Sequence, residues 1–358
     1  MKLIILGDLH LREREPYDNP PIFSRLEEKL RRLKEVIDFT MIHGQGLILM
    51  GDTFDTKNPS EQLKHRFIQA LVPLLSNNVP VWVIIGNHES NLHVHPLLSI
   101  KTLCGVQVDY PLHIIDTFSS QLFHGLLLHF LPHLSADKTL EAVASVKEND
   151  HPQILFAHTS LEGVTLENNY HIASELKPHH LEAFDLAFFG HIHKRQNGTQ
   201  PIPWFFVGAA MPHSFGEASN EAGFTVLSID DEASIEYIRL PSSTFYTATF
   251  TEENTIDDLP ANIEPGYTVV KVIFKGSAEF LKSETVKEMQ QQLTARQGTS
   301  YKKIMFDRLC TDQQVIEEEQ PTEHLSDAIE EVVKKQQKPT SYIKAGVSLL
   351  QRAHDEIE

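Results

Sequence analysis

Cysteine is scarce in this sequence, and no apolar run is long enough to cross a membrane. With two cysteines, Cys104 and Cys310, the chain cannot build a disulfide framework or a thiolate zinc site. Both are expected to be small buried residues in a reducing, cytoplasmic environment. The apolar stretch Met1–Leu6 is too short for the core of a signal peptide. A phosphate-binding P-loop is also missing, so we do not expect this chain to hydrolyse ATP.

Positive charge is in short supply as well. Lysine and arginine number 31 against 49 aspartates and glutamates, which gives a net charge of −18 over 358 residues. A protein that holds nucleic acid by itself usually has a basic face, so this balance argues against tight DNA binding by the isolated chain. The objection weakens if divalent cations sit at the site or if a partner chain supplies part of the grip. The length allows one large domain and a smaller one.

Histidine, in contrast, is abundant, with 20 residues, and some of it follows a pattern. Five times, an apolar run typical of a buried strand ends in a cluster of ligand-type residues. The runs and the clusters that follow them are Lys2–Leu6 with Gly7-Asp8-Leu9-His10, Gly46–Met50 with Gly51-Asp52-Thr53-Phe54-Asp55, Val79–Ile85 with Gly86-Asn87-His88-Glu89, Gln153–Ala157 with His158, and Leu186–Phe189 with Gly190-His191-Ile192-His193.

Helical spacing of apolar residues separates the first three runs. It predicts helices over Ser24–His43 and Ser60–Asn77, with Ser24 as the N-cap of the first. Alternating strands and helices indicate right-handed crossovers in an α/β fold, in which ligand residues collect at the carboxyl ends of the strands. We therefore expect all five clusters to meet at one edge of a sheet.

The side chains that would meet there offer oxygen and imidazole donors and no sulfur. Such a set suits Mn²⁺, Fe²⁺, Mg²⁺ or Zn²⁺, and seven donors fit two ions better than one. The candidate ligands are Asp8, His10, Asp52, Asn87, His158, His191 and His193.

In this order, the motifs D-x-H, G-D-x-x-D, G-N-H-E, a single histidine after a strand, and G-H-x-H resemble those of the calcineurin-like metallophosphoesterases. The resemblance implies a four-layer α-β-β-α sandwich and two divalent ions, Mn²⁺ in first place with Mg²⁺ or another ion as alternatives. One ion would be bound by Asp8, His10, Asp52 and His193, and the other by Asp52, Asn87, His158 and His191. Asp52 would bridge the two ions, and a water held between them would attack phosphorus.

Further residues around these motifs receive roles from the same resemblance. His88 matches the family's catalytic histidine, which donates a proton or hydrogen bond to the leaving oxygen; the alternative is a histidine that merely packs. Asp55 and Glu89 are expected to orient ligand histidines, although surface or turn roles are nearly as plausible. His213 is expected near the ligands or in the substrate groove, whereas for His133 a packing role is favoured.

Two stretches are similar to a narrower group, the SbcD-type nuclease subunits of bacteria and phages. Gly51–Thr56 resembles G-D-x-F-D-T, and Pro212–Glu217 resembles P-x-S-F-x-E, although Ala209 and Ala210 replace an expected serine. This resemblance implies a DNA exonuclease and endonuclease that serves end processing, recombination and repair. It would work as a homodimer with an SMC-like ATPase of the SbcC type, in the cytoplasm (the host's, if phage-encoded), with no membrane association.

The rest of the chain is interpreted in the same frame. We expect a nuclease domain over 1–241, a smaller α+β DNA-capping domain over 245–310 and a helical C-terminal tail over 321–358 for partner docking. Strands are predicted near Phe245–Phe250 and Tyr267–Phe274 and a helix over Glu279–Leu293, with lysines for DNA contact. The lysines could instead form a solvated face, and the tail could pack on its own domain.

Two other functions remain open on the sequence. A small-molecule phosphodiesterase or phosphatase would use the same core but would need neither the tail helices nor a lysine-bearing cap. A metal-free interaction scaffold would keep the fold, but it is disfavoured because a competent residue fills every ligand position.

Overall fold

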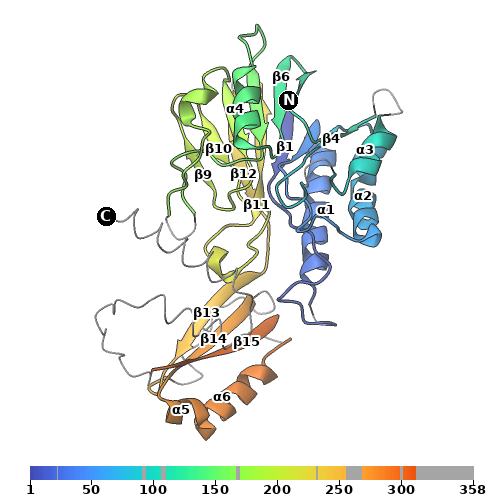
Figure 1. Cartoon of the computed structure of the whole chain (residues 1–358). Coiled ribbons are helices and arrows are strands. Elements are labelled where there is room, and N and C mark those ends of the chain that lie inside the picture. The colour runs from blue at the N-terminus through green and yellow to red at the C-terminus, as the bar shows by residue number, and fades with distance from the viewer. Residues whose placement is uncertain are drawn as a thin grey trace, which may run out of the picture.

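The computed structural model describes residues 1–21, 23–90, 94–105, 110–166, 170–230, 233–254, 268–298 and 301–311. These residues form two six-stranded sheets that face each other and a separate three-stranded sheet with two helices (Figure 1). The predicted tail over 321–358 lies outside the described residues. In the described part of the chain, no helix is long and apolar enough to cross a membrane.

The first sheet carries three of the five predicted strands. Its order is β12 (Ala233–Arg239), β11 (Gly223–Ile229), β1 (Lys2–Leu6), β2 (Gly46–Leu49), β3 (Val81–Ile84) and β4 (Leu112–Ile115). Strands β1 to β4 pair in parallel, whereas β11 runs antiparallel to both of its neighbours. The helices α1 (Arg25–His43), α2 (Glu61–Ser76) and α3 (Leu98–Cys104) connect the parallel strands. Ser24 caps α1 as predicted, and Ser60 caps α2, each by accepting a backbone N–H bond.

The second sheet carries the other two predicted strands. Its order is β5 (Ser119–Phe123), β6 (Leu126–Leu131), β7 (Gln153–Ala157), β8 (Leu186–Phe189), β10 (Trp204–Phe206) and β9 (Gln196–Gly198). The expectation that the five clusters share the edge of one sheet is therefore wrong. They lie at the carboxyl ends of strands in two facing sheets, because β7 pairs with β6 and β8 and not with the first sheet.

Three hydrophobic cores hold the layers together and give the four-layer α-β-β-α sandwich. Helices α1 and α2 cover the outer face of the first sheet, with Leu33, Phe67 and Leu71 fully buried. Side chains such as Trp82 and Phe156 fill the space between the sheets. On the far side, α4 (Ala136–Ala144) and the 3₁₀ turn Pro178–Leu181 cover the second sheet. Burial of this many large apolar side chains is the main favourable term in folding.

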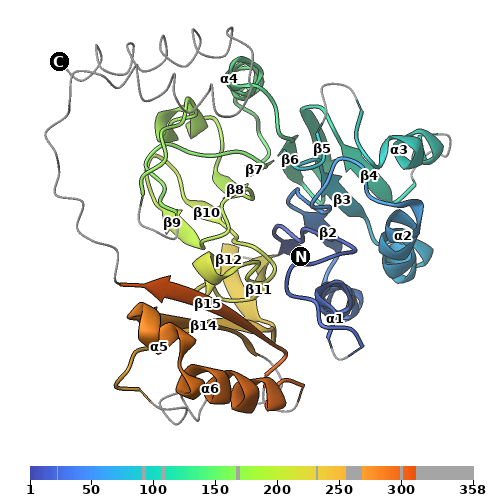
Figure 2. The same cartoon turned by 60° about the horizontal axis from the view of Figure 1, so that its bottom comes forward.

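The three-stranded sheet forms a unit below the sandwich (Figures 1 and 2). Its parallel strands are β13 (Thr244–Phe250), β14 (Thr268–Gly276) and β15 (Lys303–Cys310), and its helices are α5 (Ala278–Lys282) and α6 (Glu284–Ala295). The single helix predicted over Glu279–Leu293 is broken, because Ser283 has an extended backbone and caps α6. The strand β15 was not predicted.

The unit is attached to the sandwich by buried polar and aromatic contacts. The Glu28 carboxylate accepts hydrogen bonds from the backbone N–H and the hydroxyl of Ser243, immediately before β13. Phe23, Phe245 and Val269 form a small core across the junction. These contacts place the three-stranded unit beside α1.

Both cysteines are free. The expectation that both are buried is wrong, because Cys104 is half-buried and Cys310 is exposed. Cys310 ends the edge strand β15, whose last four residues are all exposed. An edge strand has a neighbouring strand on one side only, and a local sequence pattern does not reveal which strand lies at the edge.

Candidate metal centre

The structure brings all seven predicted ligand residues together where the carboxyl ends of the two sheets meet. Asp8 and His10 follow β1, Asp52 follows β2, and Asn87 follows β3. His158 follows β7, and His191 and His193 follow β8. Short turns after parallel strands therefore supply every donor, and each turn starts from a strand with a buried, fixed backbone.

One half of the site surrounds His10. Donor atoms of Asp8, His10 and Asp52 all lie within 4.8 Å of one another. Nε2 of His10 also lies 3.1 Å from Nε2 of His193, so the two imidazoles point at a common position. Two carboxylates and two imidazoles facing one point are a donor set that Mn²⁺, Fe²⁺ and Zn²⁺ accept.

The other half surrounds Asn87. Its Oδ1 lies 2.9 Å from Nε2 of His158 and 2.8 Å from Nδ1 of His191. Nε2 of His158 is 3.3 Å from Oδ2 of Asp52, and donor atoms of Asp52, His158 and His191 lie within 4.8 Å of one another. Asp52 thus belongs to both halves, as a carboxylate with two oxygens can when it bridges neighbouring ions.

The site is buried and strongly charged. Asp8 and His158 are 0% exposed, and Asp52 is 2% exposed. Burial by itself would raise the pKa of Asp52, but His158 and His10 beside it hold that pKa well below its usual range. Burial would lower the pKa of His158, but the carboxylates of Asp52 and Asp8 outweigh it and raise the pKa to about 9. Burial, together with His158, lowers the pKa of His191 to about 4. Buried carboxylates require a cation, and a divalent ion can replace the proton on a histidine.

Backbone strain is concentrated at the ligand turns. His10, Asp52 and His191 have φ angles of 47°, 44° and 78°, in the left-handed region that non-glycine residues rarely adopt. Each such residue costs on the order of 1–3 kcal/mol, and the surrounding structure must pin it in place. Such outliers cluster at functional sites because they aim a side chain in a direction that ordinary turns do not allow.

Two glycines leave the room that the ligands need. A Cβ on Gly51, whose φ is +105°, would overlap the imidazole ring of His158. A Cβ on Gly86 would overlap the carboxylate and the backbone nitrogen of Asp52. The glycine before each of these ligand motifs is thus explained by close approach of a ligand side chain from another strand.

Three ligand histidines are held in one orientation by a hydrogen-bond partner on their second ring nitrogen. Nδ1 of His10 lies 3.1 Å from Oδ1 of Asp55, as predicted for Asp55. Nδ1 of His193 lies 3.1 Å from Oε1 of Glu217, and Nδ1 of His158 donates to the backbone oxygen of Met50 at 2.7 Å. Partners of this kind fix the ring and its tautomer. Glu217 had no predicted role, although it ends the stretch that resembles P-x-S-F-x-E.

Glu89 has a different role from the predicted one. Its carboxylate is fully buried and accepts backbone N–H bonds from Phe54 and Gly86 at 3.0 and 3.1 Å. Burial, with a contribution from nearby Asp52, raises its pKa to about 8. Glu89 therefore joins the turn after β2 to the turn after β3, and positions their backbones instead of a histidine ring.

His88 is the most open histidine of the cluster, with a side chain 42% exposed. Its ring lies 4.6 Å from the His10 ring between centroids, and its Nδ1 is 3.4 Å from Oδ1 of Asp55. The hydrogen bond to Asp55 raises the pKa of His88. Its backbone N–H donates to Oδ1 of Asp52 at 2.9 Å, so the same residue also orients a ligand.

His213 and His133 flank the two halves of the site. The His213 ring lies 4.8 Å from the His10 ring and 5.1 Å from the His193 ring, and its backbone N–H donates to Glu217. Its buried Nδ1 has no hydrogen-bond partner among the described residues. The His133 ring lies 6.4 Å from that of His191 between centroids, a distance that fits the packing role favoured from the sequence.

The residues present fit divalent metal ions. The donors are oxygen and imidazole, their atoms converge on two positions that share Asp52, and glycines leave the space for that convergence. The carboxylates of Asp8 and Asp52 are buried side by side at the centre, and a bound cation would offset the cost of burying their charges.

Comparison with known proteins agrees with this chemistry. Residues 1–195 match the calcineurin-like phosphoesterase family. The DNA double-strand break repair protein Mre11 of Sulfolobus acidocaldarius is 25% identical over 201 residues, which are 55% of this chain and 50% of that protein. The chain thus spans about half the length of this relative.

Solved structures with a related fold are more distant. GAP50 of Plasmodium, described as the anchor in the inner membrane complex, is 12% identical, with a TM-score of 0.40 over 67% of this chain and 84% of that chain. Vps29 of Chaetomium thermophilum is 9% identical, with a TM-score of 0.29 over 68% of this chain and 97% of that chain. Likenesses at this level do not inform on activity.

Proposed function

Because the chain belongs to the calcineurin-like phosphoesterases, metal-dependent hydrolases of phosphoester bonds, we propose that it is a DNA nuclease subunit. It would hydrolyse phosphodiester bonds in DNA end processing, recombination and repair, at a centre of two divalent ions with Mn²⁺ as the leading candidate. The observation that carries the proposal is the convergence of seven oxygen and imidazole donors on two positions that share Asp52.

The chain's own residues would divide the work as follows. Two ions held by the seven donors would polarise a phosphoryl oxygen and activate a water. The exposed ring of His88 would contact the leaving oxygen and donate a proton or hydrogen bond to it. Asp55, which contacts both His10 and His88, would keep the two rings at a fixed separation. Glu217 would hold the His193 ring in one orientation.

DNA is the proposed substrate for two reasons. The relative from Sulfolobus acidocaldarius is a DNA double-strand break repair protein, and it is similar to 55% of this chain. In addition, the unit formed by β13–β15 lies beside the sandwich (Figure 2), as a domain that contacts a long substrate would. We assign residues 1–241 to the nuclease domain and 245–310 to a capping domain that contacts the DNA backbone.

The lysines of the capping unit do not all suit DNA contact. Lys303 donates to the backbone oxygen of Asp18, and Lys302 lies over the Phe23 ring at 4.9 Å, so both help to attach the unit. Lys275 and Lys282 are exposed and remain the better candidates for phosphate contact.

Partners are part of the same proposal. Large apolar side chains are exposed on α2 and on α3, with Val72 39% and Leu103 71% exposed. Exposed apolar surface often marks a protein interface, which supports a homodimer formed through these two helices. An SMC-like ATPase is proposed as the second partner from the SbcD-type motifs, and the cytoplasm is proposed as the location of the assembly.

The test is degradation of end-labelled double- and single-stranded DNA with Mn²⁺, with and without EDTA. We expect degradation by the wild type, none by Asp52→Ala, and a loss of about 100-fold or more in His88→Ala. His151→Ala, which changes an exposed histidine outside the site, is the matched control and should behave as the wild type.

Two outcomes would contradict the proposal. If Asp52→Ala degrades DNA as the wild type does, the activity does not come from this site. If the wild type hydrolyses bis-p-nitrophenyl phosphate but leaves DNA intact even with an SMC-like ATPase added, the substrate is a small phosphodiester.

A further inference from the structure

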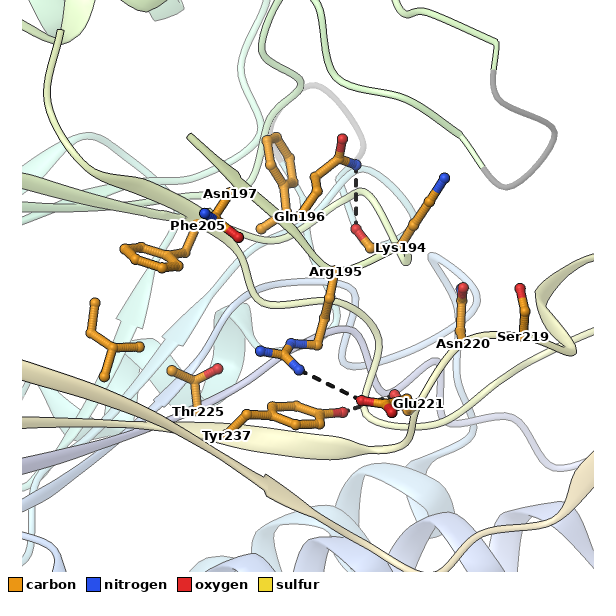
Figure 3. Close-up of a pocket in the computed structure, with 12 residues that line it drawn as sticks. Lys194, Arg195, Gln196, Asn197, Phe205, Ser219, Asn220, Glu221, Thr225 and Tyr237 are labelled. Atoms are coloured by element: carbon orange, nitrogen blue, oxygen red, sulfur yellow. Dashed lines mark hydrogen bonds and ion pairs between the residues drawn. The ribbon is translucent and has the colours of Figure 1, made fainter. Parts of the chain in front are cut away.

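A cavity of about 450 Å³ lies at one end of the sandwich, where the edges of the two sheets separate. Its floor comes from β11 and β12 of the first sheet, and its opposite wall comes from β9 and β10 of the second (Figure 3). Such a volume is in the usual range for a bound small molecule or a nucleotide. None of the seven predicted metal ligands lines it.

The cavity is nevertheless joined to the metal centre by two segments of chain. Lys194 and Arg195 follow His193 directly, so Arg195 is two residues, at most about 7 Å of backbone, from a predicted ligand. Ser219 lies two residues after Glu217, which contacts the His193 ring. A strand whose phosphodiester lies at the metal centre could therefore place a neighbouring nucleotide in this cavity.

A planar stack is built into the floor. The guanidinium carbon of Arg195 lies 3.4 Å from the centroid of the Tyr237 ring. The Tyr237 hydroxyl donates to the backbone oxygen of Glu221 at 2.8 Å, and Arg195 lies 3.8 Å from the Glu221 carboxylate. Figure 3 shows Arg195 lying over Tyr237, with Asn197 and Phe205 on the other side of the cavity. The guanidinium is thus supported from below by an aromatic ring.

The charge of the lining differs from that of the chain. Lys194 and Arg195 bring two cations to the cavity and Glu221 one anion, whereas the whole chain carries −18. The other polar groups are neutral amides and hydroxyls, which can bond to the edge of a base. Guanidinium planes and aromatic rings are the surfaces on which unpaired bases stack. A local positive charge with a planar stack favours a nucleotide over an apolar peptide.

We propose that this cavity receives one unpaired nucleotide of the substrate strand, with its base stacked on the Arg195–Tyr237 pair and its phosphate near Lys194. The proposal rests on the proposed nuclease function and adds where the strand goes after it leaves the metal centre. It also gives the site a preference for unpaired strand over intact duplex, because a paired base cannot enter the cavity.

The experiment uses short single-stranded oligonucleotides that each carry 2-aminopurine at one position, since the fluorescence of this base falls when it stacks. The full chain is titrated in EDTA at low salt, so that cleavage stops and weak binding remains measurable. We expect quenching at one position or two adjacent ones in the wild type. Arg195→Ala should abolish the quenching and weaken oligonucleotide binding by about tenfold, as expected for one lost stacking contact.

Matched variants separate stacking from charge and from folding. Arg66→Ala, which removes an arginine of α2 in the outer helical layer, should keep the quenching. Arg195→Lys keeps the charge without the plane and should also lose the quenching, and it replaces the alanine variant if that one fails to fold. Quenching that persists in both Arg195 variants, or that occurs at no position, overturns the proposal.

The outcome is distinguishable from a failure of the nuclease function. Degradation of DNA by the wild type without any Arg195-dependent quenching overturns the cavity assignment alone. Absence of Mn²⁺-dependent degradation overturns the nuclease assignment, whatever the fluorescence shows.

Discussion

Replacing Gly51 with alanine removes nothing from the metal centre and adds one methyl group. Gly51 has a φ of +105°, and a Cβ there would overlap Nδ1 and Cγ of the His158 ring. His158 is fully buried and lies 2.9 Å from Asn87 and 3.3 Å from Asp52, so its ring has no free direction in which to retreat. The substitution therefore tests whether the position of His158 matters.

The magnitude has two parts. The left-handed backbone alone costs an alanine about 1–2 kcal/mol of stability, which lowers the melting temperature by roughly 2–4 °C per kcal/mol. The overlap then displaces His158 or the turn that carries Asp52. A displacement of about 1 Å at a catalytic centre can cost on the order of 100-fold in rate. We therefore expect a folded protein with a loss of about 100-fold in activity and weaker metal binding.

A matched control separates the two parts. Gly125 has a φ of +81° and no heavy atom within 4 Å of its ideal Cβ position. Gly125→Ala therefore has the stability cost of the left-handed backbone but no overlap with a neighbouring side chain. Both variants are measured by Mn²⁺-dependent hydrolysis of bis-p-nitrophenyl phosphate and by thermal unfolding. If Gly51→Ala is as active as Gly125→Ala, the position of the His158 ring does not limit the chemistry and the reasoning fails.

Three further substitutions test the surroundings of the site. Glu217→Ala removes the partner of a ligand histidine and should weaken Mn²⁺ binding by about 10–100-fold in calorimetry; unchanged affinity would exclude that role. Leu103→Asp, at a side chain 71% exposed on α3, should give a monomer in light scattering, while the control Leu122→Asp, at a side chain 56% exposed on β5, should leave a dimer. Glu28→Gln removes the carboxylate that faces the buried guanidinium of Arg25 and should cost about 3–5 kcal/mol in urea unfolding; a cost below about 1 kcal/mol, as for an exposed ion pair, would refute the importance of the buried pairing.

The strand-and-turn units could be predicted from the sequence because they are local. A strand buried on both faces is a continuous apolar run, and the ligands follow it in the next few residues. The predicted bounds of β1 (Lys2–Leu6), β7 (Gln153–Ala157) and β8 (Leu186–Phe189) are those in the structure. The order of the ligand motifs gave the family by resemblance, and the match over residues 1–195 confirms it.

The division into two sheets could not be predicted in the same way. Whether β7 joins β1 or forms another sheet depends on pairing between distant segments, such as Leu3 with Leu227, and not on the apolar run itself. The role of Glu217 was missed for the same reason: it is 24 residues from His193 in sequence. The one sequence signal for Glu217 was its position at the end of the stretch Pro212–Glu217, which resembles P-x-S-F-x-E.

The buried charges of α1 were also beyond a pattern argument. Arg25, Glu28 and Lys29 fall outside the apolar stripe of the helix, which predicts solvent exposure. In the structure all three are buried, because Pro212, Ser243 and the turn at His10 supply partners for them. These partners come from three separate parts of the chain, and only the assembled fold brings them to one helix.

The central claim is that one chain holds two metal ions that share Asp52. The most direct measurement is the Mn²⁺ content of the purified chain after equilibration and desalting, by elemental analysis against protein concentration. The account predicts two ions per chain in the wild type and the loss of both in Asp52→Ala, because the shared carboxylate belongs to both sets of donors. A wild type that retains no Mn²⁺, or an Asp52→Ala variant that still retains two ions, would contradict it.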